Sequence, residues 1–227
     1  MKYLEKKHCD VKYLQCLTGE REPIENLQEI EKIEEIKKLL EYLKKKHGIE
    51  HSQDLIGKCE PIDILELIEK DEHIDNNEVA EFAKEFYKLD KNNDYSLHKN
   101  LLQVSNNIIA TNYDDAFEKA ASSQEINVVF AGRDKKLAAF IEKDDPAILK
   151  LHGSITDGDS MIILPSNYRK LYEDIHEDAK RVIFHLGNFF ANKTILFLGY
   201  SMGEFQINHI FRMSKDSLAS IANVNIL

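Results

Sequence analysis

Three apolar segments of this chain each end in polar side chains that can take part in chemistry. An asparagine, Asn112, follows the first segment, a histidine, His152, follows the second, and a serine, Ser201, follows the third. The three polar ends are Ala110-Thr111-Asn112-Tyr113-Asp114, Leu151-His152-Gly153-Ser154 and Gly199-Tyr200-Ser201-Met202-Gly203. Each apolar segment is typical of a buried strand, and ligands of open α/β sheets bind beyond the carboxyl ends of parallel strands. The sequence therefore predicts one pocket built from three loops.

The residue types at these ends fit a reaction that moves a proton near neutral pH. His152 can act as a general base, with room for its ring left by Gly153, although a single histidine after a strand is more often structural. Asn112 can hydrogen-bond a ribose hydroxyl or a water, or it can cap the helix expected from residue 114. Gly199 allows a tight turn, after which backbone N–H groups and the Ser201 hydroxyl can face a ligand.

Two other patterns resemble known sites but fail at specific positions. Residues 199–203 match the G-x-S-x-G turn of serine hydrolases, in which an acid and then a histidine must follow the serine. His209 precedes Asp216 here, which is the wrong order. A serine hydrolase is therefore a distant third hypothesis, behind two functions that the three motifs favour when taken together. Residues 90–94 imitate a calcium-binding loop but lack its glycine and its final glutamate, which indicates a turn between helices.

The composition argues against several classes of protein. The chain has 227 residues and a formal net charge of −10, whereas a general nucleic-acid surface needs clustered basic residues. No apolar run approaches the roughly 20 residues that span a membrane, and the amino terminus lacks the apolar core of a signal peptide. The three cysteines form no C-x-x-C pair, which fits a cytoplasmic protein and excludes a four-cysteine zinc site, so no metal site is predicted.

The chain changes character near residue 105. Residues 1–104 are polar and helical in pattern, which predicts a helical N-terminal or cap region with helices at 24–46, 61–69, 76–88 and 96–104. Residues 105–227 alternate strand and helix patterns, which predicts an α/β fold with a parallel sheet, continuous with the first part as one domain. The expected strands are 107–110, 127–130, 147–151, 161–164, 194–198 and 224–227, with helices at 114–122, 134–141, 166–172, 177–190 and 205–213. The apolar final strand has no cap, which suggests either that a further region once followed it or that the chain has been cut there.

These segments resemble the three core motifs of SIR2-like domains, in particular the bacterial branch found in anti-phage defence proteins. The motifs are Thr111-Asn112-Tyr113-Asp114, Leu151-His152-Gly153-Ser154 and Gly199-Tyr200-Ser201. Residues 97–102, 161–164 and 168–172 provide additional matches, and the resemblance covers about residues 75–215. Each motif alone is weakly specific, but three in this order and spacing are more so.

The resemblance implies a Rossmann-like parallel sheet, in a domain that binds NAD as a substrate and breaks its nicotinamide–ribose bond. His152 would activate a ribose hydroxyl or a water, and Asn112 would orient the water or the nicotinamide ribose, so these two are the implied catalytic residues. The implied NAD-binding residues are Thr111, Asp114, Gly199 and Ser201. Deacetylase sirtuins also carry a four-cysteine zinc module, and its absence here favours NAD hydrolysis over deacetylation.

One departure from the family pattern leaves two functions open. SIR2-like domains normally begin with a strand followed by Gly-Ala-Gly-x-Ser, whose backbone holds the NAD phosphates, and this chain has no such segment. Either the phosphate site is built differently, or the first strand–helix unit has been lost. The leading hypothesis is an NAD hydrolase of bacterial defence, and the alternative is a degenerate, non-catalytic binding or regulatory module. Besides NAD, the sequence leaves open a homo-oligomer or a sensor protein as partner, and it shows no nucleic-acid or membrane site.

Overall fold

The computed structural model describes residues 27–48, 56, 58–90, 92–105, 107–121, 125–132, 134–142, 145–173, 177–198, 207, 210–211 and 225–226. Contacts divide the chain into two compact units. Unit 1 is Met1–Phe86 with Ile163–Pro165, and unit 2 is Tyr87–Ile162 with Ser166–Leu227. The boundary expected near residue 105 and the expected single domain remain predictions. Within the described ranges, no helix is long and apolar enough to cross a membrane.

The described part of unit 1 contains the helices α3 (Leu27–His47), α4 (Pro61–Glu69) and α5 (Asn76–Phe86), close to the predicted ranges. Pro61 stands at the start of α4, where its fixed φ suits the first helical turn and no N–H bond is lost. Gly48 follows α3 with a φ of 68° and donates its N–H to the Lys44 carbonyl, which ends the helix. The apolar faces of the three helices form one buried cluster that includes Leu43, Ile68, Val79 and Leu164.

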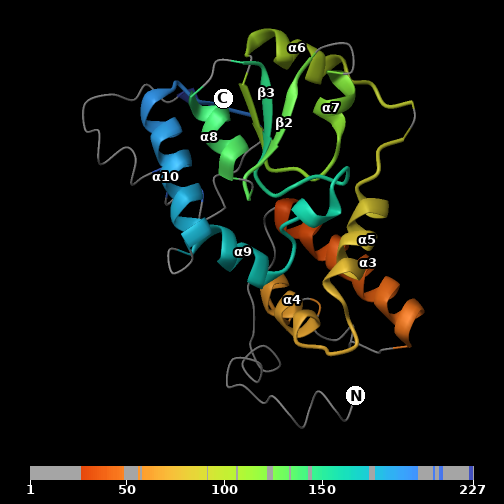
Figure 1. The fold of residues 1–227 in the computed structure, drawn as a ribbon. Helices are drawn as coiled ribbons and strands as arrows, with labels where there is room; N and C mark the ends of the chain where they lie inside the picture. The colour runs from red at the N-terminus through yellow and green to blue at the C-terminus, as the bar shows by residue number, and fades with distance from the viewer. Residues whose placement is uncertain are drawn as a thin grey trace. The chain divides into compact units, whose positions relative to one another are not determined.

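Unit 2 contains the alternating strands and helices that the sequence predicts. The elements are α6 (Ser96–Val104), β1 (Asn107–Ala110), α7 (Ala116–Ala120), β2 (Asn127–Phe130), α8 (Asp134–Glu142), β3 (Ala147–Lys150), a short 3-10 turn (Gly158–Ser160), α9 (Pro165–Tyr172), α10 (Glu177–Asn192), β4 (Leu196–Phe197) and β5 (Asn225–Ile226). Figure 1 shows this order, and the expected α/β class with a Rossmann-like parallel sheet is confirmed.

Among the described residues, the main sheet has three parallel strands in the order β1-β3-β2. The central strand is therefore β3, which comes last of the three in sequence. Ala110 pairs with Lys150, and Phe130 pairs with Lys150 from the other side. All four residues of β3 are buried, whereas β1 is half-buried throughout. This difference follows from position, because a central strand has neighbours on both edges as well as on both faces.

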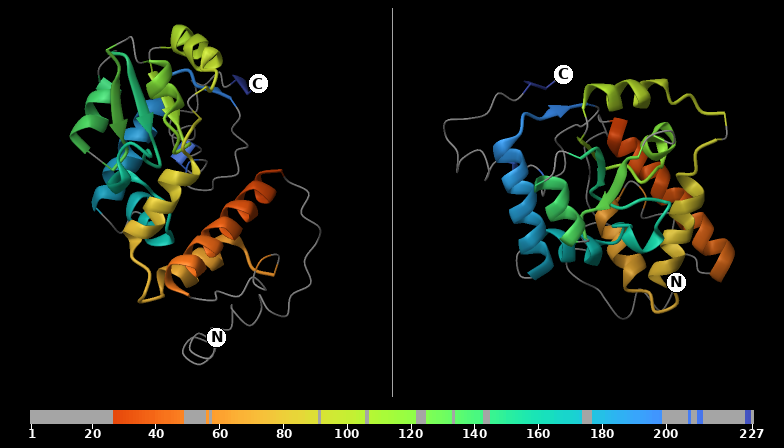
Figure 2. Two further views of the ribbon diagram at one scale, coloured as in Figure 1. Left: turned by 90° about the vertical axis from the view of Figure 1, so that its right-hand side faces the viewer. Right: turned by 45° about the horizontal axis from the view of Figure 1, so that its top comes forward.

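Helices cover both faces of this sheet (Figures 1 and 2). On one face, Val129 and Leu149 pack in a cluster with side chains of α8 and α10, among them Leu137, Leu186 and Phe189. On the other face, Ile148 of β3 packs with residues of α6 and α7. Successive residues of β3 thus point to opposite layers, as the period of two in a strand requires.

Two sequence predictions about strands are wrong. Residues 161–164 form no strand in this structure. Ile163 and Leu164 are apolar because they pack in the helical cluster of unit 1, not because they join a sheet. The strand at residues 194–198 was expected in the main sheet, but β4 pairs instead with β5 in a separate parallel pair. Leu196 and Leu198 are exposed, which an inner strand of the main sheet would not allow.

Candidate functional site

The Asn112 loop and the His152 loop leave the carboxyl ends of two neighbouring strands, β1 and β3. The Leu151 N–H donates to the Ala110 carbonyl, and the Ile155 N–H donates to the Tyr113 carbonyl, both at 2.9 Å. The segment after β1 therefore runs beside the segment after β3. The helix after β1, α7, covers one face of the sheet, and α10, which follows β3, covers the other. In open α/β sheets, ligands bind beyond the carboxyl ends of neighbouring strands whose connections leave to opposite faces. We use the word crevice for this edge of the sheet, which consists of the loops after β1 and β3.

The His152 side chain is buried, with only 2% of the residue exposed. Its Nε2 lies 3.1 Å from the Tyr172 hydroxyl, within hydrogen-bonding distance. Three tyrosine rings surround it, with centroids at 5.2 Å for Tyr168, 6.0 Å for Tyr172 and 6.5 Å for Tyr113. A hydrogen bond to one ring nitrogen fixes the orientation of an imidazole and restricts its tautomer. The fold thus holds a single orientation of the candidate base.

Gly153 makes a tight turn after His152, close to the backbone of Ser160. Its φ is 84°, a left-handed conformation that favours glycine. A Cβ atom at this position would stand 2.1 Å from the Ser160 carbonyl oxygen, which is backbone and cannot easily move away. The turn is closed further by Ile162, whose N–H donates to the His152 carbonyl at 2.9 Å. The Tyr113 hydroxyl donates to the carbonyl of the same Ile162, so this residue joins both loops.

Asn112 is exposed, and the first N–H of the helix that follows bonds to another residue. The Asp114 carboxylate accepts the Ala116 N–H at 2.9 Å at the start of α7, a bond that satisfies one unpaired N–H of the first turn. Asp115 holds the N-cap position and makes no side-chain cap bond, so Asn112 does not cap α7. Thr111, between β1 and Asn112, is half-buried.

A buried lysine lies beneath the two loops. Lys150 ends β3, is 1% exposed, and its Nζ donates to the Asp114 carbonyl at 2.5 Å. The same Nζ lies 3.8 Å from the Glu118 carboxylate on α7, and that carboxylate accepts the hydroxyl of Ser154 at 3.1 Å. Thr156 donates its hydroxyl to Ser154 in turn, at 3.0 Å. Burial lowers the pKa of Lys150 below its ordinary value, and the neighbouring carboxylates, Glu118 first, oppose this shift only in part.

Two of the predicted site residues, Gly199 and Ser201, lie outside the described residues, and so does the strand-to-helix turn predicted around them. A depression of about 550 Å³ lies at the opposite edge of the sheet, where β2 and β3 begin. Its lining consists of Glu125, Ile126, Asn127, Asp145 and Pro146. It contains no residue of the three motifs and lies at the amino ends of the strands, so we do not assign a site to it.

Comparison with known families identifies the class of protein that this fold and these loops define. The model of the SIR2-like domain matches residues 106–225, which include β1, β2, β3 and both loops of the crevice. The chain belongs to the SIR2-like domain family. No curated protein matches the sequence.

The sequence did not identify three of the residues that shape this crevice. Tyr172 is separated from His152 by 20 positions, and only the packing of α9 brings its hydroxyl to the imidazole. Lys150 looked like one polar residue in an apolar strand, and Glu118 like one of several charges on a short helix. The only available signal was the lysine itself, because a charged residue in a central strand is rarely buried unless it has partners.

Proposed function

We propose that this SIR2-like domain hydrolyses NAD to nicotinamide and ADP-ribose, with His152 as the general base, and that it does so in bacterial anti-phage defence. The observation that carries the proposal is the pair of neighbouring loops that follow β1 and β3. It combines a buried, oriented imidazole with an exposed amide on the neighbouring loop. Membership of the SIR2-like family directs this pair of side chains toward NAD.

The reaction breaks the bond between the ribose C1′ and the nicotinamide nitrogen, and the bonding electrons leave with nicotinamide. Water forms the new bond to C1′ and loses one proton, so the products are nicotinamide, ADP-ribose and a proton. Positive charge develops on the ribose as the bond breaks, and a neutral imidazole that accepts a proton from a ribose hydroxyl or from the water stabilises that change. General bases of this kind typically contribute about 10²–10⁴-fold to a rate. The Asn112 amide can orient the water or the ribose because it both donates and accepts hydrogen bonds.

The chemistry of the described side chains fits the ribose part of NAD. Hydroxyl groups need acceptors, and the crevice offers an imidazole and an amide there. The same region carries Asp114, Asp115 and Glu118, which would repel a pyrophosphate. We therefore place the nicotinamide ribose near His152 and assign the phosphates to no described residue. Thr111, Asp114, Gly199 and Ser201 remain proposed NAD-binding residues, with Asp114 acting from the start of α7.

The test is whether the full chain consumes NAD, with the release of nicotinamide as the measured quantity. We expect turnover in the unsubstituted protein and at least about tenfold slower turnover in Asn112→Ala, because one positioned hydrogen-bonding group is lost. Asn112 is exposed and does not cap α7, so Asn112→Ala should melt at the temperature of the unsubstituted protein. Full activity in Asn112→Ala would remove the amide from the site.

A non-catalytic binding module is the second candidate, and the lack of a Gly-Ala-Gly-x-Ser segment favours it. Titration calorimetry with NAD separates the two functions. Binding without nicotinamide release identifies a binding module, and binding with release identifies the hydrolase. If neither occurs, NAD is not the ligand of this chain.

A further inference from the structure

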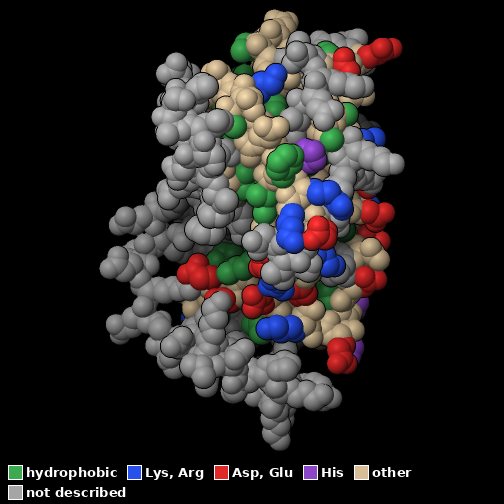
Figure 3. Space-filling model, turned by 60° about the vertical axis from the view of Figure 1, so that its left-hand side comes forward, with side chains coloured by type: hydrophobic (Ala, Val, Ile, Leu, Met, Phe, Trp, Pro, Cys, Tyr) green, Lys and Arg blue, Asp and Glu red, His purple; other side chains and the backbone are tan. Residues whose placement is uncertain are grey.

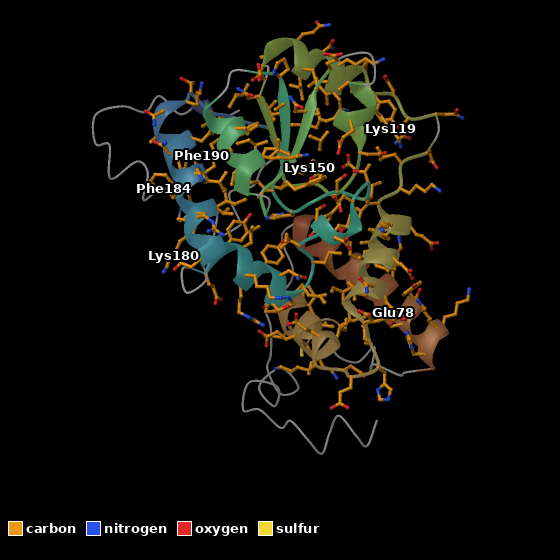
Figure 4. The ribbon with its side chains drawn as sticks, viewed as in Figure 1. Glu78, Lys119, Lys150, Lys180, Phe184 and Phe190 are labelled. Carbon is orange, nitrogen blue, oxygen red and sulfur yellow. The ribbon has the colours of Figure 1, made fainter. Side chains whose placement is uncertain are left out.

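The two loops of the crevice are joined below His152 by a continuous chain of polar contacts. Lys150 Nζ donates to the carbonyl of Asp114, the last residue of the Asn112 motif. Glu118, 3.8 Å from the same Nζ, accepts the hydroxyl of Ser154, two positions after His152. Lys150, at the end of β3, therefore contacts the loop after β1 directly. It is linked to Ser154 of the loop after β3 through Glu118 of α7. Figure 4 labels Lys150 at the end of the sheet.

Stability alone gives no reason for a lysine at this position. The other three residues of β3 are Ala147, Ile148 and Leu149, all apolar and buried. Removing a charged amine from water is costly, and apolar residues of similar size often serve a buried position as well or better. The lysine instead fixes the positions of two groups, because its N–H donates to the Asp114 carbonyl and its charge attracts the Glu118 carboxylate. An apolar side chain could fill the same space but could not hold those oxygens.

We propose that Lys150, together with Glu118, is a positioning residue that fixes the Asn112 loop against the His152 loop for cleavage of the nicotinamide–ribose bond. The proposal rests on the proposed function. Neither residue touches the reacting atoms in this account, and both act through the loops. A displacement of about 1 Å between catalytic groups can cost about 10²-fold in rate, so a fixed separation of the two loops bears directly on turnover.

The first test is Lys150→Met, which keeps a long unbranched side chain and removes the charge and the N–H donors. We expect kcat to fall about 10- to 100-fold, with a much smaller change in KM, since the loss is one of alignment. The control is Lys119→Met. Lys119 lies next to Glu118 and is labelled in Figure 4. Its Nζ pairs at 3.0 Å with the carboxylate of Asp115, the residue before α7, and so does not join the two loops. It should keep the kcat of the unsubstituted protein.

The double variant Lys150→Met/Glu118→Gln separates positioning from simple charge burial. In Lys150→Met, Glu118 loses its cationic partner, and that alone could disturb the site. Glutamine removes the charge but keeps an acceptor for the Ser154 hydroxyl. If kcat stays low in the double variant, positioning by Lys150 is supported. If kcat returns to that of the unsubstituted protein, the loss came from the unpaired carboxylate, and the proposal is overturned.

A readout independent of activity is amide hydrogen exchange at Ile155, whose N–H bonds the Tyr113 carbonyl across the two loops. We expect faster exchange at Ile155 in Lys150→Met and unchanged exchange in Lys119→Met. Unchanged exchange in Lys150→Met overturns the proposal whether or not NAD is cleaved. If the unsubstituted protein releases no nicotinamide, the proposed function fails, and exchange at Ile155 alone then decides whether Lys150 fixes the loops.

Discussion

Each unit contains a lysine in an ion-pair cluster, and the two lysines are held under opposite conditions. In unit 1, Lys46 Nζ lies 3.2 Å from carboxylate oxygens of both Glu78 and Glu81, with 38% of its side chain exposed. Hydrogen bonds to Tyr42 and Glu78 raise the pKa of Lys46. In unit 2, Lys150 is 1% exposed, and burial lowers its pKa. The first lysine gains partners without leaving water, whereas the second loses water and is only partly compensated.

The comparison shows which cluster calls for an explanation beyond stability. Exposed ion pairs are screened by salt and commonly contribute little, so the Lys46 cluster is an ordinary surface feature. A buried lysine at the end of a central strand is costly, and its amine contacts the loop after β1 directly and the loop after β3 through Glu118. The exposed hydrophobic side chains give no comparable reason to propose a second site. Phe184 on α10 is 68% exposed, but hydrophobic side chains on the face shown in Figure 3 are scattered among charged ones.

The largest expected effect contrasts two glycines with positive φ, Gly153 after His152 and Gly48 after α3. Gly48→Ala meets nothing within 4 Å, so it should cost only the strain of a left-handed alanine, about 1 kcal/mol. Gly153→Ala adds a backbone clash to that strain and should cost about 4 kcal/mol. Urea unfolding of both variants measures the difference. Equal costs would mean that the turn after His152 is looser than described.

The second expected effect contrasts two carboxylates, Glu118 beside Lys150 and Glu81 beside Lys46. Glu118→Ala leaves the buried lysine without its carboxylate partner and should lower the free energy of unfolding by about 2–3 kcal/mol. This is less than for a fully buried pair, because Glu118 is slightly exposed. Glu81→Ala should change it by too little to resolve at high salt. The same denaturant series at low and high salt checks both. A large, salt-dependent loss in Glu81→Ala would reverse the comparison.

The third expected effect is that Lys150 and Lys46 make the free energy of unfolding depend on pH in opposite directions. A lysine whose pKa is lowered in the folded state binds fewer protons than in the unfolded state, so stability rises with pH. The rise extends from the lowered pKa to the unfolded value of about 10.4. For Lys46 the pKa is raised, so its contribution is complete below about pH 10.4 and is lost only above it.

Unfolding in urea from about pH 8 to about pH 10.4 tests this contrast. The stability of the unsubstituted protein should rise with pH relative to Lys150→Met and stay constant relative to Lys46→Met. A constant difference for Lys150→Met would show that the buried amine keeps an ordinary pKa.

The strands were predictable wherever local pattern decides the structure. The predicted ranges of β1 and β2 agree with the structure because short β-branched runs lie between polar residues. Residues 161–164 have the same pattern but pack among the helices of unit 1, a choice made by tertiary contacts. The burial of Lys150 depends on the strand order β1-β3-β2, which periodicity does not reveal. The sequence predicted that the loops of His152 and Asn112 lie side by side. It could not show that Tyr172 bonds the imidazole or that the Ala116 N–H at the start of α7 bonds to Asp114.

The central claim is that His152 is the base that cleaves NAD, and nicotinamide release by His152→Gln tests it most directly. Because His152 is buried, rates must be compared per folded molecule, with the folded fraction taken from a thermal melt. Phe184→Ala, an exposed change on α10, is the control and should keep the full rate. We expect His152→Gln to be slower by about 10²–10⁴-fold, the usual contribution of a general base. A folded His152→Gln protein that releases nicotinamide at the unsubstituted rate would contradict the account.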